Sequence, residues 1–246
     1  MNFDKETKVK EIALASPEAR QVLENAGVDF CCGGGQSLHD ACAHANVSAE
    51  QILSQLRENS KKVRPEEKAW QSAPLEDLTR HIREKHHRYV RAAINRIRIS
   101  LEKVKSVHGG NHPEIADVQN LFSAVAQDMI MHMQKEEQIL FPYIDALERS
   151  VNEKTPLEPP FFQTVQNPIQ AMMTEHDSAG DLVKQIRKAS GEYAPPADAC
   201  ESYKALYQDL RDFEADLHQH VHLENNILFP RAVEMEAAVS RPGIAS

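Results

Sequence analysis

The feature that most constrains this chain is a repeated pattern, His-x-x-x-Glu-x-x-Ile-Leu-Phe-Pro. It occurs at residues 132–142 and again at residues 220–230. The histidine and glutamate of each copy are four positions apart, so on a helix they share one face, one turn apart. His132 with Glu136, and His220 with Glu224, can therefore each chelate a cation through one imidazole and one carboxylate.

A histidine also precedes each copy at a matched distance. By subtraction, His87 lies 45 residues before His132, and His176 lies 44 residues before His220. Two helical hairpins about a pseudo-twofold axis would bring all six groups together, as in other metal sites of helical bundles. Four imidazoles and two carboxylates suit iron or manganese better than structural zinc, and they exceed the needs of one tetrahedral ion. We therefore predict a centre of two non-haem iron ions with oxo and carboxylate bridges.

A purely structural origin of the repeat is the competing interpretation. A single His-x-x-x-Glu pair on a helix is most often a surface hydrogen bond. A duplicated hairpin could keep Ile-Leu-Phe-Pro for packing alone, but it would not need histidine and glutamate on the same inward stripe, where unpaired polar groups cost stability. The matched upstream histidines favour metal binding.

Glycines and prolines divide the chain after Pro74 into four long segments in which apolar residues recur every three or four positions. We predict helices over residues 75–107, 113–148, 167–190 and 197–238. Helices of this length suggest a bundle. The sequence thus predicts an all-α protein, with a four-helix bundle at 75–240, a polar linker at 61–74 and a small helical domain at 1–60. In that domain, Ser37 is a candidate N-cap with Asp40 three positions later.

A second constellation is the pair Cys31-Cys32, which three glycines follow. Glycine allows positive φ, so we expect both thiols to be exposed at a turn, as a reactive or metal-handling pair. The alternative is a buried small residue before a turn. Cys42 and Cys200 are expected to be structural.

The remaining histidines have weaker patterns. On a helix, His86 points about 100° away from His87, so it competes as a ligand only if the register differs. His108 is expected in a loop or near the site, and His112, His218 and His222 are expected to be exposed. His39, His44 and His81 belong to no motif.

Composition limits the classes of partner. A formal net charge of −9 argues against nucleic acid and against anionic membranes, because both need a basic face. We see no signal peptide and no run of about 18 apolar residues, so we expect a cytoplasmic protein without a membrane helix. In that compartment the cysteines are expected to be free, redox-active or metal-linked.

With these residues assembled, the chain resembles the repair-of-iron-centres family, the di-iron iron–sulfur cluster repair proteins of bacteria. Residues 29–38 are similar to that family's cysteine-bearing domain, residues 70–75 to its junction, and the two repeats to its hemerythrin-like domain. The resemblance implies a hemerythrin-like four-helix bundle. It also implies repair of clusters damaged by nitric oxide or oxidative stress, by supplying iron, with damaged iron–sulfur proteins as partners.

The resemblance also implies roles for individual residues. Glu136 and Glu224 would bridge the two irons, and Cys31 and Cys32 match the family's cysteine pair, which we assign a catalytic role. The implied metal ligands are His87, His132, Glu136, His176, His220 and Glu224.

One difference from the oxygen-carrying hemerythrins is informative. Those proteins resemble this chain but carry a further histidine four positions after the third-helix histidine, where this chain has Gly180. The missing ligand favours a more open site. A di-iron nitric oxide reductase and a sensor or binding protein for nitric oxide or oxygen remain alternatives. A ferritin-like oxidase is disfavoured, because Glu84-x-x-His87 has no equivalent before His176. The two-domain layout suggests that the small domain docks on a partner or on a second copy of the chain, as a homodimer.

Overall fold

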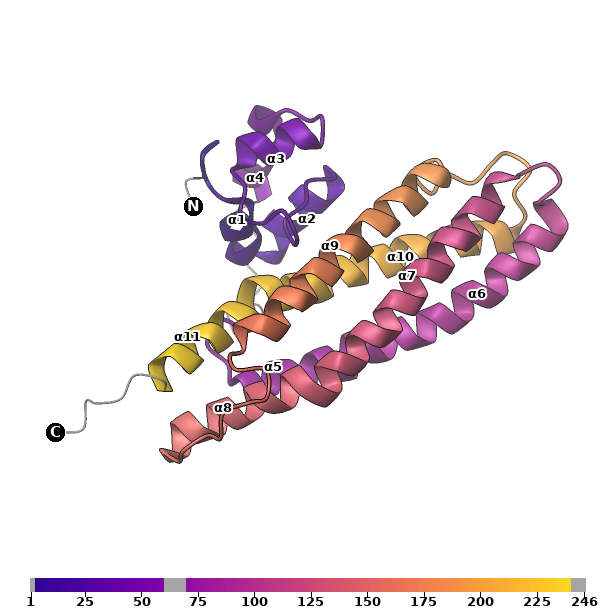
Figure 1. The fold of residues 1–246 in the computed structure, drawn as a ribbon. Coiled ribbons are helices and arrows are strands. Elements are labelled where there is room, and N and C mark those ends of the chain that lie inside the picture. Colours follow the sequence, from indigo (N-terminus) through magenta and orange to yellow (C-terminus); the bar gives the residue numbers. More distant parts are fainter. Residues whose placement is uncertain (1–2, 60–69, 240–246) are drawn as a thin grey trace.

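The fold has two helical parts, a small N-terminal domain and a bundle of four long rods (Figure 1). The structure is a computed structural model that describes residues 3–59 and 70–239. The predicted all-α fold, a four-helix bundle after a small helical domain, is confirmed. Most of the predicted linker, residues 61–69, lies outside the described residues.

The four rods of the bundle run antiparallel to their neighbours in the chain, with turns after α6 and α9 at one end (Figure 1). Three rods contain a short π-helical segment (η). The rods are α5 Leu75–His81 with η1 Ile82–His87 and α6 Arg88–His108; α7 Glu114–Lys135 with η2 Glu136–Leu140 and α8 Phe141–Glu153; α9 Gln166–Ala189; and α10 Glu201–Leu223 with η3 Glu224–Leu228 and α11 Phe229–Val239. The second rod extends beyond the predicted residue 148 to Glu153, where Lys154 takes a left-handed conformation.

Two of the π segments explain the Ile-Leu-Phe-Pro part of the repeat. Proline has no N–H, and in an α-helix its ring clashes with the carbonyl four residues earlier. In each copy the wider π turn ends two residues before the proline, Pro142 or Pro230, and the rod continues through the proline. The N–H of Phe141 donates to the carbonyl of Glu136. π-Helical turns are rare and often occur at functional sites.

The interior of the bundle consists of two apolar clusters with a polar layer between them. One cluster lies toward the α6–α7 turn and includes Ile94 and Phe122. The other surrounds α5, α8 and α11 and includes Leu78 and Phe229. The polar layer between them contains the repeated histidines and glutamates, which are buried.

The repeat continues beyond the proline, to a carboxylate that caps a rod. Glu148 lies 12 residues after Glu136, and Glu236 lies 12 residues after Glu224, by subtraction. The Glu148 carboxylate accepts hydrogen bonds from the N–H of Leu75 at 2.8 Å and of Glu76 at 2.9 Å. Glu236 accepts from the N–H of Val165 at 2.9 Å. Each carboxylate thus satisfies N–H groups that a helix start leaves unpaired.

The π segment η1 accounts for a mismatch between the halves. By subtraction, 12 residues separate the capped Leu75 from His87, but 11 separate the capped Val165 from His176. A π turn accommodates one additional residue without breaking the helix. The additional residue of the first half is therefore absorbed in η1, and both histidines reach the same level of the bundle.

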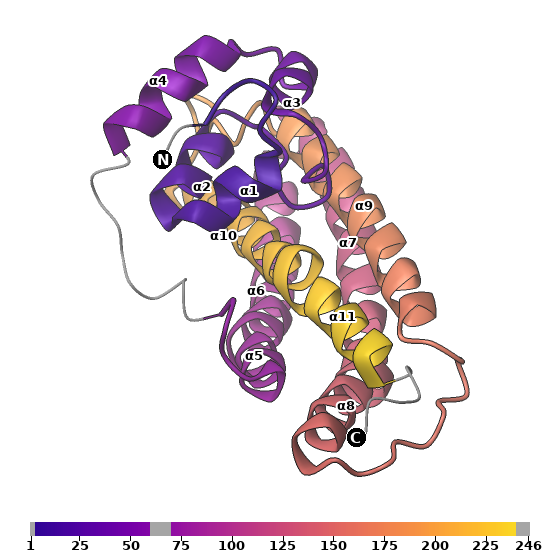
Figure 2. The ribbon, with the colours of Figure 1, turned by 90° about the vertical axis from the view of Figure 1, so that its left-hand side faces the viewer.

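The small domain consists of α1 Val9–Ala15, α2 Pro17–Asn25, α3 Leu38–His44 and α4 Ala49–Asn59. The Ser37 hydroxyl accepts from the N–H of Asp40 at 3.1 Å, so the predicted cap of α3 is present. The domain packs against α9, α10 and η3, on the side that faces the viewer in Figure 2. Its apolar residues belong to the same buried cluster as the part of the bundle that lies toward the α6–α7 turn.

We expect Glu148→Ala to lower the free energy of unfolding by about 2 kcal/mol, because two N–H groups at the start of α5 lose their acceptor. Denaturant unfolding followed by helical circular dichroism measures this change. Glu153→Ala, which removes an exposed glutamate from the same helix, should change it by less than about 0.5 kcal/mol. Equal stability of the two variants would mean that the cap contributes nothing.

Candidate metal centre

Four histidines and two glutamates from all four rods meet in the polar layer of the bundle. His87 ends η1, His132 lies in α7, His176 in α9 and His220 in α10, while Glu136 and Glu224 begin η2 and η3. Each of the six is at most 1% exposed. The structure therefore brings together every residue that the repeat singled out.

The six side chains form two groups that share both carboxylates. His87 and His220 form one group with Glu136 and Glu224, and His132 and His176 form the other with the same two glutamates. In each group, the ligand atoms lie within 4.8 Å of one another. The sequence pairs the ligands within each half of the repeat, whereas the structure draws one histidine of each group from either half. The pseudo-twofold axis that relates the two halves of the repeat therefore exchanges one group with the other.

The imidazoles face one another through their Nε2 atoms. The Nε2 atoms of His87 and His220 are 3.2 Å apart, and those of His132 and His176 are 3.0 Å apart. Carboxylate oxygens lie close to the same atoms: Glu136 Oε2 is 3.3 Å from His87 Nε2, and Glu224 Oε2 is 3.1 Å from His176 Nε2.

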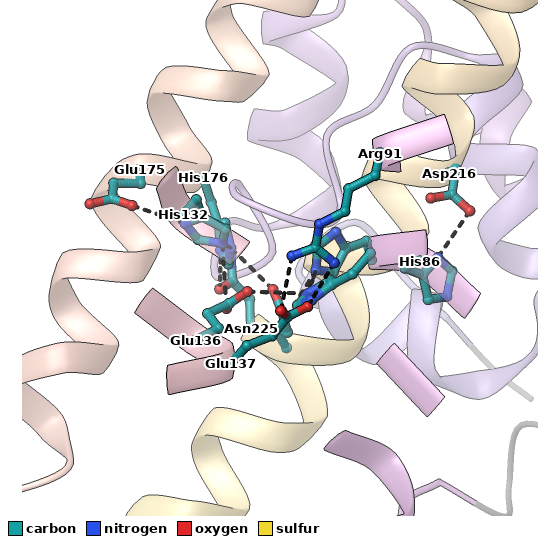
Figure 3. Close-up of polar contacts among 12 residues, drawn as sticks. His86, Arg91, His132, Glu136, Glu137, Glu175, His176, Asp216 and Asn225 are labelled. Carbon is teal, nitrogen blue, oxygen red and sulfur yellow. Dashed lines mark hydrogen bonds and ion pairs between the residues drawn. The ribbon is translucent and has the colours of Figure 1, made fainter. Parts of the chain in front are cut away.

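Outer partners set the tautomer of three of these histidines (Figure 3). The Nδ1 atom of His87 lies 2.7 Å from Glu137, that of His132 lies 3.0 Å from Glu175, and that of His176 lies 2.9 Å from Asn225 Oδ1. Since these oxygens accept, Nδ1 of each ring carries a proton, and Nε2 is the nitrogen that can offer a lone pair to a metal ion. Facing lone pairs at 3 Å repel, so a cation is favoured between them, whether a proton or a metal ion.

Cations outside the site hold two of these partners in place. Arg91 donates to both oxygens of Glu137, at 2.9 Å each, and Lys135 donates to Glu175 at 2.5 Å. The hydrogen bond from His132 lowers the pKa of Glu175 to about 2. Glu175 is therefore an ionised acceptor at neutral pH.

The fourth histidine breaks the symmetry. Within the described residues, Nδ1 of His220 has no hydrogen-bond partner. His86 stands where Glu175 stands in the other half, one position before a first-rod histidine. Its ring stacks on His220 at 5.7 Å and 12°, and its Nδ1 lies 2.9 Å from Asp216. His86 therefore packs against a ligand position without joining either group, as its predicted direction on the helix implies.

The repeated phenylalanines cover two histidines. Phe141 stacks on His87 with ring centroids 5.7 Å apart, and Phe229 stacks on His176 at 6.0 Å. Both phenylalanines are buried. They exclude water from one side of the site and restrict rotation of the imidazoles.

The electrostatics of the centre favour a bound cation. Within the described residues, both oxygens of Glu136 and Oε2 of Glu224 have no hydrogen-bond partner, although both side chains are fully buried. Burial lowers the pKa of His132, but the Glu136 carboxylate outweighs burial and raises this pKa to about 10. Uncompensated buried carboxylates are costly, so positive charge stabilises this layer. The donor set of imidazoles and carboxylates fits a pair of first-row metal ions.

The cysteine pair lies in a loop that packs on the centre. Asn225, which contacts His176, also donates to the carbonyl of Cys31 at 3.2 Å. Cys31 is only 6% exposed, and Cys32 is half-buried. The expectation of two exposed thiols is therefore wrong for Cys31, because the loop is covered by α9 and η3. Burial raises the pKa of Asp29 in this loop, but the N–H of Gly33 and the Lys184 ammonium outweigh it and lower the pKa overall.

Gly33 and Gly34, after the cysteines, allow other atoms to approach the backbone closely. Gly33, Gly34 and Gly35 all lack the positive φ that we expected. A Cβ on Gly34 would lie 2.9 Å from the carbonyl of Phe30 and 3.1 Å from the amide of Asn226. A Cβ on Gly180 would lie 3.8 Å from the sulfur of Cys32, so the cysteine loop covers the position that the sequence comparison with hemerythrins singled out.

The positions of the remaining histidines differ in part from those expected. His222 is buried rather than exposed, because Asn226 donates to its Nδ1 at 3.0 Å and Phe30 packs on its ring. His112 and His218 are half-buried rather than exposed. His108 lies at the α6–α7 turn, where its Nε2 is 3.2 Å from Cys200, and it joins neither group.

Sequence comparison identifies relatives of both parts of the chain. Residues 77–232 match the hemerythrin HHE cation binding domain, which confirms the hemerythrin-like fold, and residues 5–60 match the ScdA_N family, a domain of unknown function. The iron-sulfur cluster repair protein YtfE of Musicola paradisiaca is 34% identical over 233 residues, which cover 95% of this chain and 99% of that protein. The protein of the same name from Citrobacter koseri is 33% identical over 92% of this chain and 96% of its own length.

The bundle is thus a hemerythrin cation-binding domain with two buried histidine–glutamate groups, consistent with a di-metal site. Over residues 3–59 and 70–239, none of the helices is long and apolar enough to cross a bilayer.

We expect Glu175→Gln to weaken metal binding by about tenfold, because His132 loses the charged acceptor that orients it. Competition with a chromophoric chelator measures the affinity. Asp177→Asn removes a carboxylate from an exposed position on the same helix and should leave the affinity unchanged. If both variants bind metal as tightly as the parent, the outer carboxylate does not tune the site.

Proposed function

This chain belongs to the family of iron–sulfur cluster repair proteins with a hemerythrin domain, and from that membership we propose that it supplies iron to clusters damaged by nitric oxide or oxidants. The observation that supports this proposal best is the pair of buried groups that share both glutamates. They can hold two ions side by side. Damaged iron–sulfur proteins would be the recipients.

We propose that the two ions are iron and that the ligands are the six residues of the repeat. His87 and His220 would bind one ion, His132 and His176 the other, and Glu136 and Glu224 would bridge them, together with an oxo group. When bound, the ferrous ions supply the metal that a damaged cluster has lost. Histidine and carboxylate ligands suit iron.

The side chains around the centre support a site that binds iron without trapping it. Glu137, Glu175 and Asn225 orient three imidazoles, so the ligand atoms are arranged before metal arrives. Gly180 provides no seventh ligand. Six protein ligands, even with both carboxylates bridging, leave open positions on two octahedral ions. Such positions allow small molecules or incoming ligands to reach the metal.

The remaining assignments complete the proposal. Cys31 and Cys32 would act in transfer of iron or in thiol chemistry at the damaged cluster. We propose that the chain is divided into a small helical domain at 1–60, a linker at 61–74 and the four-helix bundle at 75–240. We also propose a cytoplasmic location and a function that involves neither nucleic acid nor a membrane. A homodimer through the small domain is a further hypothesis, and mass measurement in solution tests it.

Nitric oxide turnover is the second candidate, and the shared carboxylates also favour it, because they place two metal positions next to each other. It predicts more than one N₂O per centre when reductant is supplied. A sensor or binding protein would show reversible nitric oxide or oxygen spectra without turnover and without iron transfer.

We expect ferrous-loaded protein to reactivate an enzyme whose [4Fe–4S] cluster was damaged by nitric oxide, above a control with the same amount of free iron. Metal analysis should give about two iron atoms per chain, as expected for a di-iron bundle. Glu136→Leu should abolish reactivation and bound iron, because both groups lose the same carboxylate.

Glu84→Leu is the matched control. Glu84 is an exposed glutamate on the first rod, three residues from His87 and outside both groups. The Glu84→Leu variant should retain bound iron and reactivation of the damaged enzyme. Reactivation no better than free iron by the parent protein contradicts the proposed function, and tightly held zinc at one per chain contradicts the iron centre.

A further inference from the structure

The cysteine loop places three potential ligand atoms together, outside the groups described above. The side chains are those of Asp29, Cys31 and Cys32, and their ligand atoms all lie within 4.8 Å of one another. Cys31 Sγ is 4.0 Å from Cys32 Sγ and 3.3 Å from Asp29 Oδ1. The triad belongs to the small domain, whereas the two histidine–glutamate groups belong to the bundle.

Two of these separations are close to the edges of a tetrahedral metal site. With metal–sulfur bonds of about 2.3 Å and metal–oxygen bonds of about 2.1 Å, the sulfur–sulfur edge is about 3.8 Å and the sulfur–oxygen edge about 3.6 Å. The measured edges differ from these by a few tenths of an ångström. The loop can therefore bind an ion with small side-chain movements. A disulfide fits less well, because neighbouring Cα atoms are about 3.8 Å apart and most disulfides span at least about 4.4 Å.

The surroundings of the triad satisfy the other requirements of a metal site. Asp29 Oδ1 accepts from the N–H groups of Cys31, Cys32 and Gly33 at 3.0–3.1 Å, which fixes the carboxylate as ligating carboxylates usually are fixed. Asp29 Oδ2 lies 3.2 Å from the Lys184 ammonium. Two thiolates and one carboxylate carry three negative charges, which a divalent ion and Lys184 together balance.

A route to the triad is also present. Asp29 and Cys31 line a cavity of about 410 Å³ between the small domain and the bundle, together with Lys184, Arg187 and His218. Glu24 and Glu214 also line the cavity, and Glu214 accepts from Arg187, so the lining is of mixed charge. A small ligand, such as water or a thiolate, can enter such a cavity. Three protein ligands leave one tetrahedral position for that ligand.

One side chain joins the triad to the bundle centre. The amide nitrogen of Asn225 donates to the carbonyl of Cys31 at 3.2 Å. Figure 3 shows its other contact, in which Oδ1 of Asn225 lies 2.9 Å from His176 Nδ1. At the equivalent position of the other half, Glu137 contacts His87 and Arg91. Asn225 therefore holds the sulfur-bearing loop against a ligand of the di-metal centre.

We propose that Asp29, Cys31 and Cys32 form a third metal site, which binds one ferrous ion on its way from the bundle centre to a recipient cluster. The role in transfer rests on the proposed function, whereas the binding site itself does not. Binding exchanges ligands without electron transfer: the ion leaves imidazole and carboxylate ligands, binds two thiolates, and both thiol protons pass to solvent. Thiolates are also the ligands of the clusters that receive the iron.

Cobalt titration of the full chain tests the site. Co²⁺ bound to thiolate gives a sulfur-to-cobalt charge-transfer absorption that histidine and carboxylate ligands do not give. We expect the parent chain to bind one more Co²⁺ than Cys31→Ser/Cys32→Ser, and to show this absorption, which the double variant loses. Cys42→Ser and Cys200→Ser change the other two cysteines and should retain it. Helical circular dichroism checks that every variant folds.

Asp29→Asn provides a second test, because it keeps an acceptor for the three N–H groups but removes the charge. It should retain the absorption and weaken cobalt binding at the thiolate site by about tenfold. Parent protein without the charge-transfer absorption, or an unchanged absorption in Cys31→Ser/Cys32→Ser, overturns the third site.

The two proposals fail separately. If the third cobalt binds but the parent protein reactivates no damaged cluster, the proposed function is wrong and the binding site stands. If the parent protein reactivates clusters and no thiolate-bound cobalt is detected, the third site is wrong and the proposed function stands.

Discussion

The structure depends on two fully buried carboxylates that stand between four imidazoles. In an apolar core, unpaired carboxylates and facing nitrogen lone pairs would each cost several kcal/mol. Glu136 and Glu224 escape that cost only if positive charge is shared between them. Within the described part of the chain, both oxygens of Glu136 and Oε2 of Glu224 lack a hydrogen-bond partner. The apolar clusters on either side keep water out, so metal ions are the compensation that this arrangement suits.

The repeat builds this layer with matched parts and then departs from symmetry around it. Each half contributes a π turn that begins at its glutamate, a phenylalanine on its own first histidine, and a distant carboxylate that caps a rod. The outer partners differ. Glu137 contacts His87, whereas Asn225 contacts His176 at the equivalent place of the other half. Glu175 contacts His132, whereas His86 stacks on His220. The two metal positions are therefore chemically unequal. In each position one histidine is held by an outer carboxylate, but only the position of His132 and His176 also has a histidine held by an amide.

The departure at Asn225 connects the two domains. An amide has both an acceptor and donors, so it can bind His176 on one side and the Cys31 carbonyl on the other, which a carboxylate at that position could not do. The small domain is thus attached to the bundle at the metal centre, where the sulfur of Cys32 lies beside Gly180 of α9. The proposed supply of iron would use this proximity, since the imidazoles and carboxylates of the bundle and the thiolates of the loop differ in the ions that they favour.

The sequence alone determined the helical bundle and the six side chains of the polar layer, because hydrophobic period, helix breakers and a doubled His-x-x-x-Glu spacing are local properties. The capping glutamates, Glu148 and Glu236, also repeat, 12 residues after each ligand glutamate. That spacing lies outside the short motif, so the motif did not predict them. Only the tertiary structure decided that each metal group takes one histidine from either half, that His222 is buried, and that Cys31 is covered. Those outcomes depend on how rods and domains pack against one another. Contacts between segments that are distant in the chain produce no periodic pattern in the sequence.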